Sequence, residues 1–135
     1  MNLLTRSTDY AIRALIYMAG DEDRIVSTAE LDRDLKLPRP FMRKTLQMLQ
    51  KAGHLSSVKG HKGGFRLETA PEKIRLIDLM TIFQGTISLG DCLFKKKLCD
   101  CMQSCPLRKE IKRMERDVLE RLRKVTLADL MKEER

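Results

Sequence analysis

The chain has 135 residues, with 27 Lys and Arg against 19 Asp and Glu, and a formal net charge of +8 at pH 7. This length suits one compact domain with an appended helix, and the positive charge favours a polyanionic partner. There is no secretory signal pattern and no long apolar run, so we expect a cytoplasmic protein without a membrane segment. No nucleophile–base pair and no phosphate-binding loop is evident, which argues against an enzyme.

Three helices are predicted in the first third of the chain. The first covers residues 5–19. A Ser-Thr-Ala-Glu capping box then starts a second helix over residues 28–35, and a short turn at 36–38 leads to a third helix over residues 40–52. The core-facing positions of the third helix, spaced as i, i+4 and i+7, are Met42, Leu46 and Leu49.

Beside this core stripe, the third helix has a basic and amide-rich outer face. Arg and Gln are the side chains that make bidentate contacts to guanine and adenine edges in the major groove of DNA. Two short helices joined by a tight turn, the second with such a face, predict a helix-turn-helix. The alternative is an ordinary surface helix with solvated charges. The candidate DNA contacts on this helix are Arg39, Arg43, Lys44 and Gln47.

A β-hairpin with a glycine-rich, basic tip is predicted directly afterwards. Residues 55–58 and 64–67 form its strands, and the loop between them carries Lys59, His61 and Lys62, which we expect to contact DNA. Such a hairpin after a helix-turn-helix defines the winged variant. Eight Lys and Arg and no acids lie between residues 35 and 67, as a phosphate-binding surface requires.

The second half of the chain is again helical. A fourth helix over residues 72–83 is apolar on much of its circumference, so we expect it to be buried. A helix over residues 107–125 carries one long apolar stripe and is interpreted as a dimerisation helix, the alternative being that it packs on its own domain. The predicted organisation is a winged helix-turn-helix domain (1–85), a cysteine loop (86–105), the dimerisation helix (106–125) and a short last helix (126–135). The fold class is therefore mainly α with a small β-hairpin.

All four cysteines lie close together, at Cys92, Cys99, Cys101 and Cys105. In a reducing compartment, clustered cysteines are more often metal ligands or redox thiols than disulfides. Pro106 predicts a helix start after Cys105, where the helix dipole stabilises a thiolate. The short gaps fit an iron–sulfur cluster better than a tetrahedral zinc ion, although zinc and a thiol switch remain alternatives.

Taken in order, these segments resemble the IscR/NsrR family, the Rrf-type winged-helix transcription regulators of bacteria. The matching pieces are Leu4-Thr5, Tyr10-Ala11, the recognition helix from Phe41 to Leu49, the wing from Lys59 to Phe65, Ile77-Asp78-Leu79, three late cysteines, and residues 126–130. The resemblance covers nearly the whole chain. It implies a homodimer that binds a partly palindromic operator in double-stranded DNA and senses through an iron–sulfur cluster.

The resemblance also implies a set of cluster ligands. Cys92, Cys99 and Cys105 match the three ligand positions of the family. Cys101 is an extra cysteine, and Arg108 stands where the IscR-like branch has a His ligand. In the NsrR-like branch an Asp of the other subunit completes the cluster, so the fourth ligand is either Asp9 of the partner subunit or Cys101, and the cluster is 2Fe-2S or 4Fe-4S. Some family members have no cluster at all.

Two other functions compete with a cluster-sensing regulator. The first is a cluster-free winged-helix repressor that uses zinc or thiol oxidation. The second is an iron–sulfur carrier or electron-transfer protein whose basic face docks an acidic partner. The predicted wing argues against the second, because docking needs charge but no groove-shaped hairpin.

Overall fold

The computed structural model describes residues 3–89 and 104–133 of the chain. It is mainly helical with one two-stranded antiparallel hairpin, which confirms the predicted winged helix-turn-helix with a long helix after it. Its elements are α1 (Arg6–Ala19), α2 (Thr28–Leu35), α3 (Arg39–Lys51), β1 (Leu55–Val58), β2 (Gly64–Leu67), the 3₁₀-helix η1 (Pro71–Lys73), α4 (Leu76–Gln84), α5 (Pro106–Lys124) and α6 (Leu127–Glu133).

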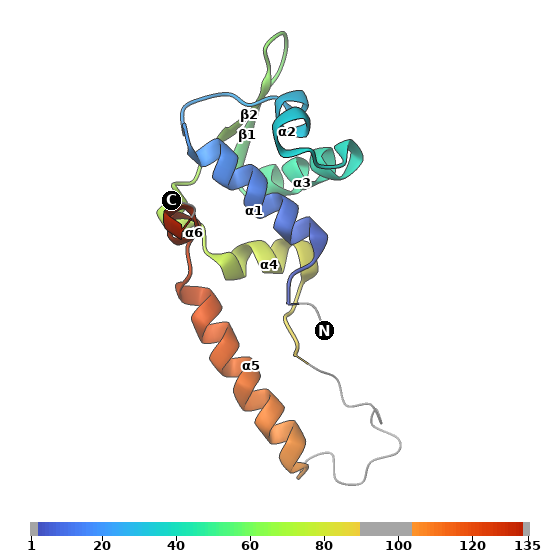
Figure 1. Cartoon of the computed structure of the whole chain (residues 1–135), viewed down its shortest axis with the longest axis vertical. Coiled ribbons are helices and arrows are strands. Elements are labelled where there is room, and N and C mark those ends of the chain that lie inside the picture. Colours follow the sequence, from blue (N-terminus) through green and yellow to red (C-terminus); the bar gives the residue numbers. More distant parts are fainter. Residues whose placement is uncertain (1–2, 90–103, 134–135) are drawn as a thin grey trace.

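Helix α1 lies at the centre of the fold, with α2, α3 and the hairpin on one side and α4 and α6 on the other (Figure 1). Its buried face is spaced at three and four residues, as an amphipathic helix requires, and includes Ala11, Leu15 and Met18. The predicted core positions of α3 are fully buried, since Met42, Leu46 and Leu49 have no exposed surface. The helix-turn-helix is therefore built on a single apolar core.

The hairpin is joined to the helical body by a third extended segment. In the β1–β2 pair, Leu55 lies opposite Leu67 and Val58 opposite Gly64. Val26, which precedes α2, forms an isolated antiparallel bridge with Phe65 of β2, and each backbone amide donates to the other residue's carbonyl at 2.8 Å. These two bonds fix the base of the wing against the segment that starts the helix-turn-helix.

The predicted fourth helix over residues 72–83 was wrong at its start. The chain forms η1, then an extended step at Ile74 and Arg75, and only then α4. The extended step pairs with residues 125–127: the Leu76 amide donates to the Val125 carbonyl at 2.9 Å and the Leu127 amide to the Ile74 carbonyl at 2.8 Å. These inter-segment hydrogen bonds replace the helical ones and hold α6 against the body.

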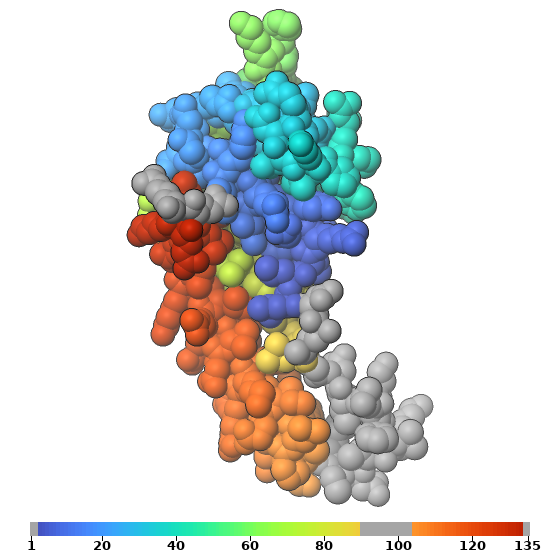
Figure 2. Space-filling view, viewed as in Figure 1, coloured from blue at the N-terminus to red at the C-terminus, as the bar shows by residue number. Residues whose placement is uncertain are grey.

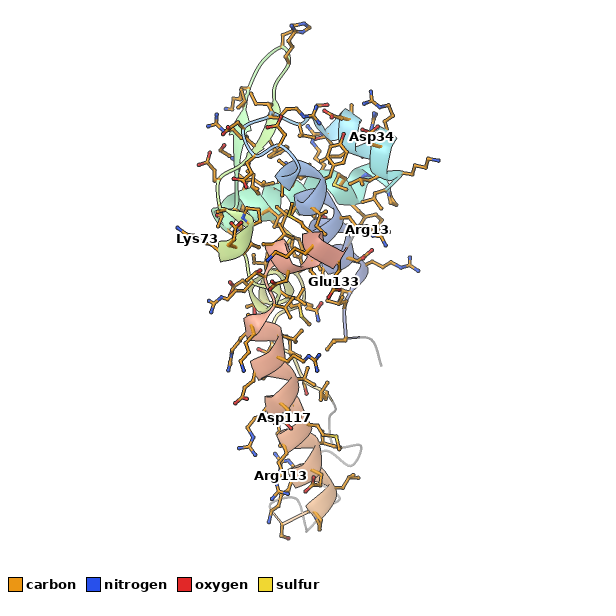
Figure 3. The ribbon with its side chains drawn as sticks, turned by 60° about the vertical axis from the view of Figure 1, so that its left-hand side comes forward. Arg13, Asp34, Lys73, Arg113, Asp117 and Glu133 are labelled. Carbon is orange, nitrogen blue, oxygen red and sulfur yellow. The ribbon has the colours of Figure 1, made fainter. Side chains whose placement is uncertain are left out.

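Among the described residues, the apolar packing of helix α5 on the body lies in its C-terminal half. There Leu122 is buried with Met80 of α4 and Ile87 in a second apolar cluster, against which Val118 also packs. The N-terminal half extends away from the body and carries Arg113 (Figure 3). The apolar stripe is exposed there: Leu107 retains 67% of its accessible surface and Met114 57%. Within the described residues, no helix has the length and apolar character needed to cross a membrane.

Candidate nucleic-acid interface

Three polar side chains of α3 point away from the core. Arg43, Lys44 and Gln47 are all exposed. In residues 3–89 and 104–133, none of the three makes a hydrogen bond or an ion pair. A guanidinium, an ammonium and an amide in one row therefore keep their full hydrogen-bonding capacity for a ligand.

Arg39, the fourth candidate on α3, has a partner within the chain. Its Nε donates to Asp32 Oδ2 of α2 at 2.8 Å. The Asp32 side chain is only 14% exposed, and its other oxygen, Oδ1, is buried with no hydrogen-bond partner among the described residues. The pair braces the turn between α2 and α3, so Arg39 is less available to DNA than the sequence indicated.

The wing tip is shaped by residues in the left-handed region. Gly60 has φ of 99° and Lys62 has φ of 63°, which a non-glycine residue adopts at some energetic cost. A Cβ at Gly63 would lie 2.3 Å from the Val58 carbonyl oxygen, so only glycine fits there. The compact tip extends beyond the body, at the top of Figure 2, and the side chains of Lys59, His61 and Lys62 are exposed.

The wing and α3 are tied to each other. Gln50 Nε2 of α3 donates to Ser57 Oγ of β1 at 3.0 Å. Helix α3 also packs directly on β1. The two predicted DNA-contacting elements therefore form one rigid unit, with unpaired cations on both.

A cluster around Tyr17 holds α1 against α2. The phenol lies within hydrogen-bonding distance of the carboxylates of Asp34 and Glu30, and Arg24 pairs with Glu30 while lying over the Tyr17 ring. The Asp34 and Glu30 carboxylates accept from the phenol and so raise the pKa of Tyr17 to about 12. The hydrogen bond from the Tyr17 phenol to Glu30, together with the one from Arg24, keeps the pKa of the Glu30 carboxyl below its usual range. These contacts fix the orientation of α2, the first helix of the helix-turn-helix, relative to α1.

An aromatic pair that sequence reasoning did not assign to the interface lies at the start of α3. Phe41 is 57% exposed, and its ring lies 6.4 Å from that of Tyr10 on α1, at an angle of 59°. The sequence contained a signal for it: Phe41 falls outside the i, i+4, i+7 core stripe of its helix.

The candidate sensor residues fall partly outside the described residues. Cys92, Cys99 and Cys101 lie there, so their ligand roles stay predictions. Cys105 is described: it is half-buried at the N-cap of α5 with a free thiol, as the sequence predicted for its position. It borders an open cavity of about 580 Å³, whose other lining residues are Arg108, Lys109, Lys112, Arg113, Glu115 and Arg116.

Asp9 lies in the first turn of α1 and does not approach Cys105 of its own chain. Its Oδ2 accepts from Arg13 Nε at 2.9 Å, and its side chain is 44% exposed. Figure 1 shows α1 well separated from the start of α5. Among residues 3–89 and 104–133, no three metal-ligating side chains converge. Asp9 and Cys105 therefore do not come together in a single chain.

Gln84, at the end of α4, fixes the chain just before Asp9. Its Oε1 accepts from the Thr5 amide at 3.1 Å and from Thr8 Oγ1 at 2.8 Å, while its Nε2 donates to the Leu3 carbonyl at 2.8 Å. No pattern in the sequence predicts this contact across nearly eighty residues. It sets the first turn of α1 relative to the end of α4.

Comparison with known proteins agrees with the winged helix-turn-helix fold described above. Residues 4–133 match the Rrf2 family, described as an iron-dependent transcriptional regulator. An HTH-type transcriptional regulator of Aquifex aeolicus (strain VF5) is 39% identical over 90 residues, which are 67% of this chain and 62% of that protein. The chain thus spans about three fifths of that relative's length.

Two solved structures share the fold over nearly the whole chain. CymR (YrzC), the global cysteine regulator of B. subtilis, superimposes with a TM-score of 0.79 at 24% identity, and 98% of each chain is covered. T. potens IscR superimposes with a TM-score of 0.72 at 21% identity, covering 98% of this chain and 88% of that one. At these identities the likeness establishes the fold.

Proposed function

The chain belongs to the Rrf2 family of transcriptional regulators, and from this membership we propose that it is a homodimeric, operator-binding sensor of redox state, nitric oxide or iron–sulfur status. It is a DNA-binding transcriptional regulator and not an enzyme. In the proposed organisation, residues 1–85 bind DNA, 86–105 sense, 106–125 dimerise and 126–135 form the last short helix. The protein acts in the cytoplasm, where its DNA target lies.

The observation that carries this proposal is the row of unpaired Arg43, Lys44 and Gln47 on α3 beside the basic wing. An α-helix fits the major groove, where Arg and Gln read base edges, while cations on a hairpin contact phosphates. Each phosphate neutralised releases counterions, so affinity falls as salt rises. In this proposal, α3 reads the base sequence and the wing binds the phosphate backbone.

A binding selection tests this division of roles. Wild-type protein selects duplexes from a random-sequence library, and the enriched site is then titrated with variants. Arg43→Ala should relax base preference and cost about 1–3 kcal/mol if Arg43 contacts a base bidentately. Lys62→Ala should weaken binding evenly across sequences and lower the slope of log K against log salt by about one.

Arg123→Ala is the control, because Arg123 is an exposed residue of the same type on α5, outside the proposed DNA interface and on the helix face opposite Met114. It should bind as wild type does. Unchanged binding by the double variant Arg43→Ala, Lys62→Ala would overturn the groove-reading proposal.

The exposed stripe on the first half of α5 supports a dimer. Leu107 and Met114 leave apolar surface in water that a second α5 would bury. Two helix-turn-helix units held by this contact would reach two half-sites of a palindromic operator. Sedimentation at micromolar concentration tests this, and a monomeric wild type would contradict it.

The chemistry around Cys105 fits an iron–sulfur cluster. A thiolate at the N-terminus of α5 is stabilised by the helix dipole, and neighbouring cations, including Lys109 and Arg113, offset the negative charge of a thiolate-ligated centre. When bound, the cluster supplies iron that reacts with oxygen or nitric oxide. We propose Cys92, Cys99 and Cys105 as its cysteine ligands, completed by Asp9 of the partner subunit or by Cys101.

Anaerobic purification tests the sensor. Iron and acid-labile sulfide should be present in near-equal amounts, and Mössbauer spectra should distinguish the 2Fe-2S from the 4Fe-4S form. Stoichiometric zinc without sulfide, or thiols that oxidise without any bound metal, would instead establish the cluster-free regulator. DNA binding by α3 and the wing would survive either outcome.

A further inference from the structure

Phe41 is a large apolar side chain whose exposure the fold does not explain. It is the third residue of α3 and remains 57% exposed, while Met42 beside it is fully buried. Burial of apolar surface stabilises a fold, and more than half of the surface of Phe41 is left without that stabilisation in the single chain. A surface of this kind is a candidate contact for another molecule.

The position of Phe41 on α3 indicates which molecule covers it. Residues of an α-helix follow each other at roughly 100°, so Lys44 is its neighbour one turn on, at the edge of the polar row. In a helix-turn-helix, the N-terminal residues of the second helix are those that contact base edges. DNA seated on the unpaired cations of α3 therefore passes over Phe41.

The Phe41 ring is held in position by Tyr10 of α1. Tyr10 of α1 lies at 6.4 Å between ring centroids with a tilted geometry, which is a favourable arrangement for two aromatic rings. The backbone under Phe41 is also fixed, because Thr45 Oγ1 donates to the Phe41 carbonyl at 2.7 Å. Phe41 thus presents a positioned apolar edge instead of a freely rotating one.

We propose that Phe41 is a specificity-determining residue that contacts the 5-methyl group of a thymine in the major groove. The thymine methyl is the only apolar group that unmodified base pairs display there, and Phe is among the side chains that contact it. At the same place, a cytosine amino group would be desolvated against the ring without an acceptor, which is unfavourable. This inference rests on the proposed function, since it requires α3 to enter the major groove.

Replacing single thymines tests the contact without altering the fold. The probe is the duplex that wild-type protein enriches from a random library, with each thymine in turn replaced by deoxyuridine, which lacks only the methyl group. One thymine in each half-site should show a three- to tenfold loss of affinity. For Phe41→Ala, replacing that thymine by deoxyuridine should no longer reduce affinity, while replacement of the other thymines should have the same effect as in wild type. Phe41→Leu should show a smaller loss of affinity at that thymine than wild type does.

A second comparison uses cytosine and 5-methylcytosine at the same place. Wild type should bind the methylated duplex more tightly by a similar factor, and Phe41→Ala should bind both alike. Thermal melting of each variant checks that it is folded.

Three results would overturn the inference. The first is a site in which no thymine methyl affects affinity, and the second is an equal deoxyuridine penalty in wild type and Phe41→Ala. The third is a change in sedimentation of Phe41→Ala without any methyl effect, which would mean that a second copy of the chain covers Phe41. If Arg43→Ala weakens the same site, the proposed function survives these failures. If wild type enriches no sequence, the proposed function and this inference fall together.

Discussion

Gly64 and Gly20 allow a matched pair of alanine substitutions with opposite expected effects on stability. A Cβ at Gly64 would lie 2.3 Å from the carbonyl oxygen of Val26 and 2.7 Å from its carbonyl carbon. Backbone atoms cannot turn aside as a flexible side chain does, so the two hydrogen bonds between Val26 and Phe65 must lengthen or break. Each contributes roughly 0.5–1.5 kcal/mol, so Gly64→Ala should lower the free energy of unfolding by about 1–3 kcal/mol.

Gly20→Ala should have the reverse effect. The nearest neighbour of its Cβ would be the Tyr17 carbonyl oxygen at 3.4 Å, an ordinary contact. The φ of −62° at this position suits alanine as well as glycine. Alanine restricts the unfolded chain more than glycine does, so the free energy of unfolding should rise by roughly 0.4–1 kcal/mol.

Urea denaturation followed by circular dichroism measures both changes as shifts in the unfolding midpoint. The midpoint should fall for Gly64→Ala and rise for Gly20→Ala. Folded Gly64→Ala should also bind DNA less well, because the base of the wing moves relative to α3. If Gly64→Ala unfolds at the wild-type midpoint, the argument from the close approach of Gly64 to the Val26 carbonyl is refuted. The same holds if Gly20→Ala loses as much stability as is expected for Gly64→Ala.

Three further predictions concern the dimer, the cluster and the Tyr17 contacts. Met114→Glu should dissociate the dimer in sedimentation because it buries a charge without a partner, while Arg123→Glu, on the opposite, charged face of α5, should not; a dimeric Met114→Glu would contradict this. In anaerobic reconstitution, Asp9→Ala should change the cluster spectrum and reactivity and Cys101→Ala should leave both unchanged, since a hard carboxylate ligand is more exchangeable than a thiolate; the opposite pattern would indicate an all-cysteine cluster. Because the pKa of Tyr17 is raised, its hydrogen bonds stabilise the fold below pH 10 and are lost as pH rises toward about 12. Ultraviolet titration should show this late phenol ionisation in wild type and not in Tyr17→Phe.

Local features of the fold were predictable from sequence. The boundaries of α2 and of both strands agree with the expected residues 28–35, 55–58 and 64–67. The α2 boundary follows from its cap, where the Ser27 hydroxyl accepts from the Glu30 amide at 3.1 Å, a contact between residues three apart. The exposure of Arg43, Lys44 and Gln47 likewise follows from helical spacing relative to the core stripe.

Contacts between distant segments were not predictable in this way. The break before α4 depends on two hydrogen bonds that no pattern within residues 72–83 reveals: the Leu76 amide donates to the Val125 carbonyl, and the Ile74 carbonyl accepts from the Leu127 amide. The pairing of Arg39 with Asp32, and the packing of Phe41 against Tyr10, likewise altered or added to the predicted interface. The cysteine ligand set stays a prediction.

The sequence by itself determined the order of the α-helices and strands, the basic helix-and-wing surface and the N-cap position of Cys105. Capping, glycine placement and hydrophobic spacing act over a few residues, so their consequences are readable along the chain. Only the tertiary structure decided that Gln84 holds Leu3, that Val26 fixes the wing, and that Leu107 and Met114 of α5 are exposed. Such contacts depend on which surfaces remain for burial and hydrogen bonding once the helices have packed, and that is a property of the whole fold.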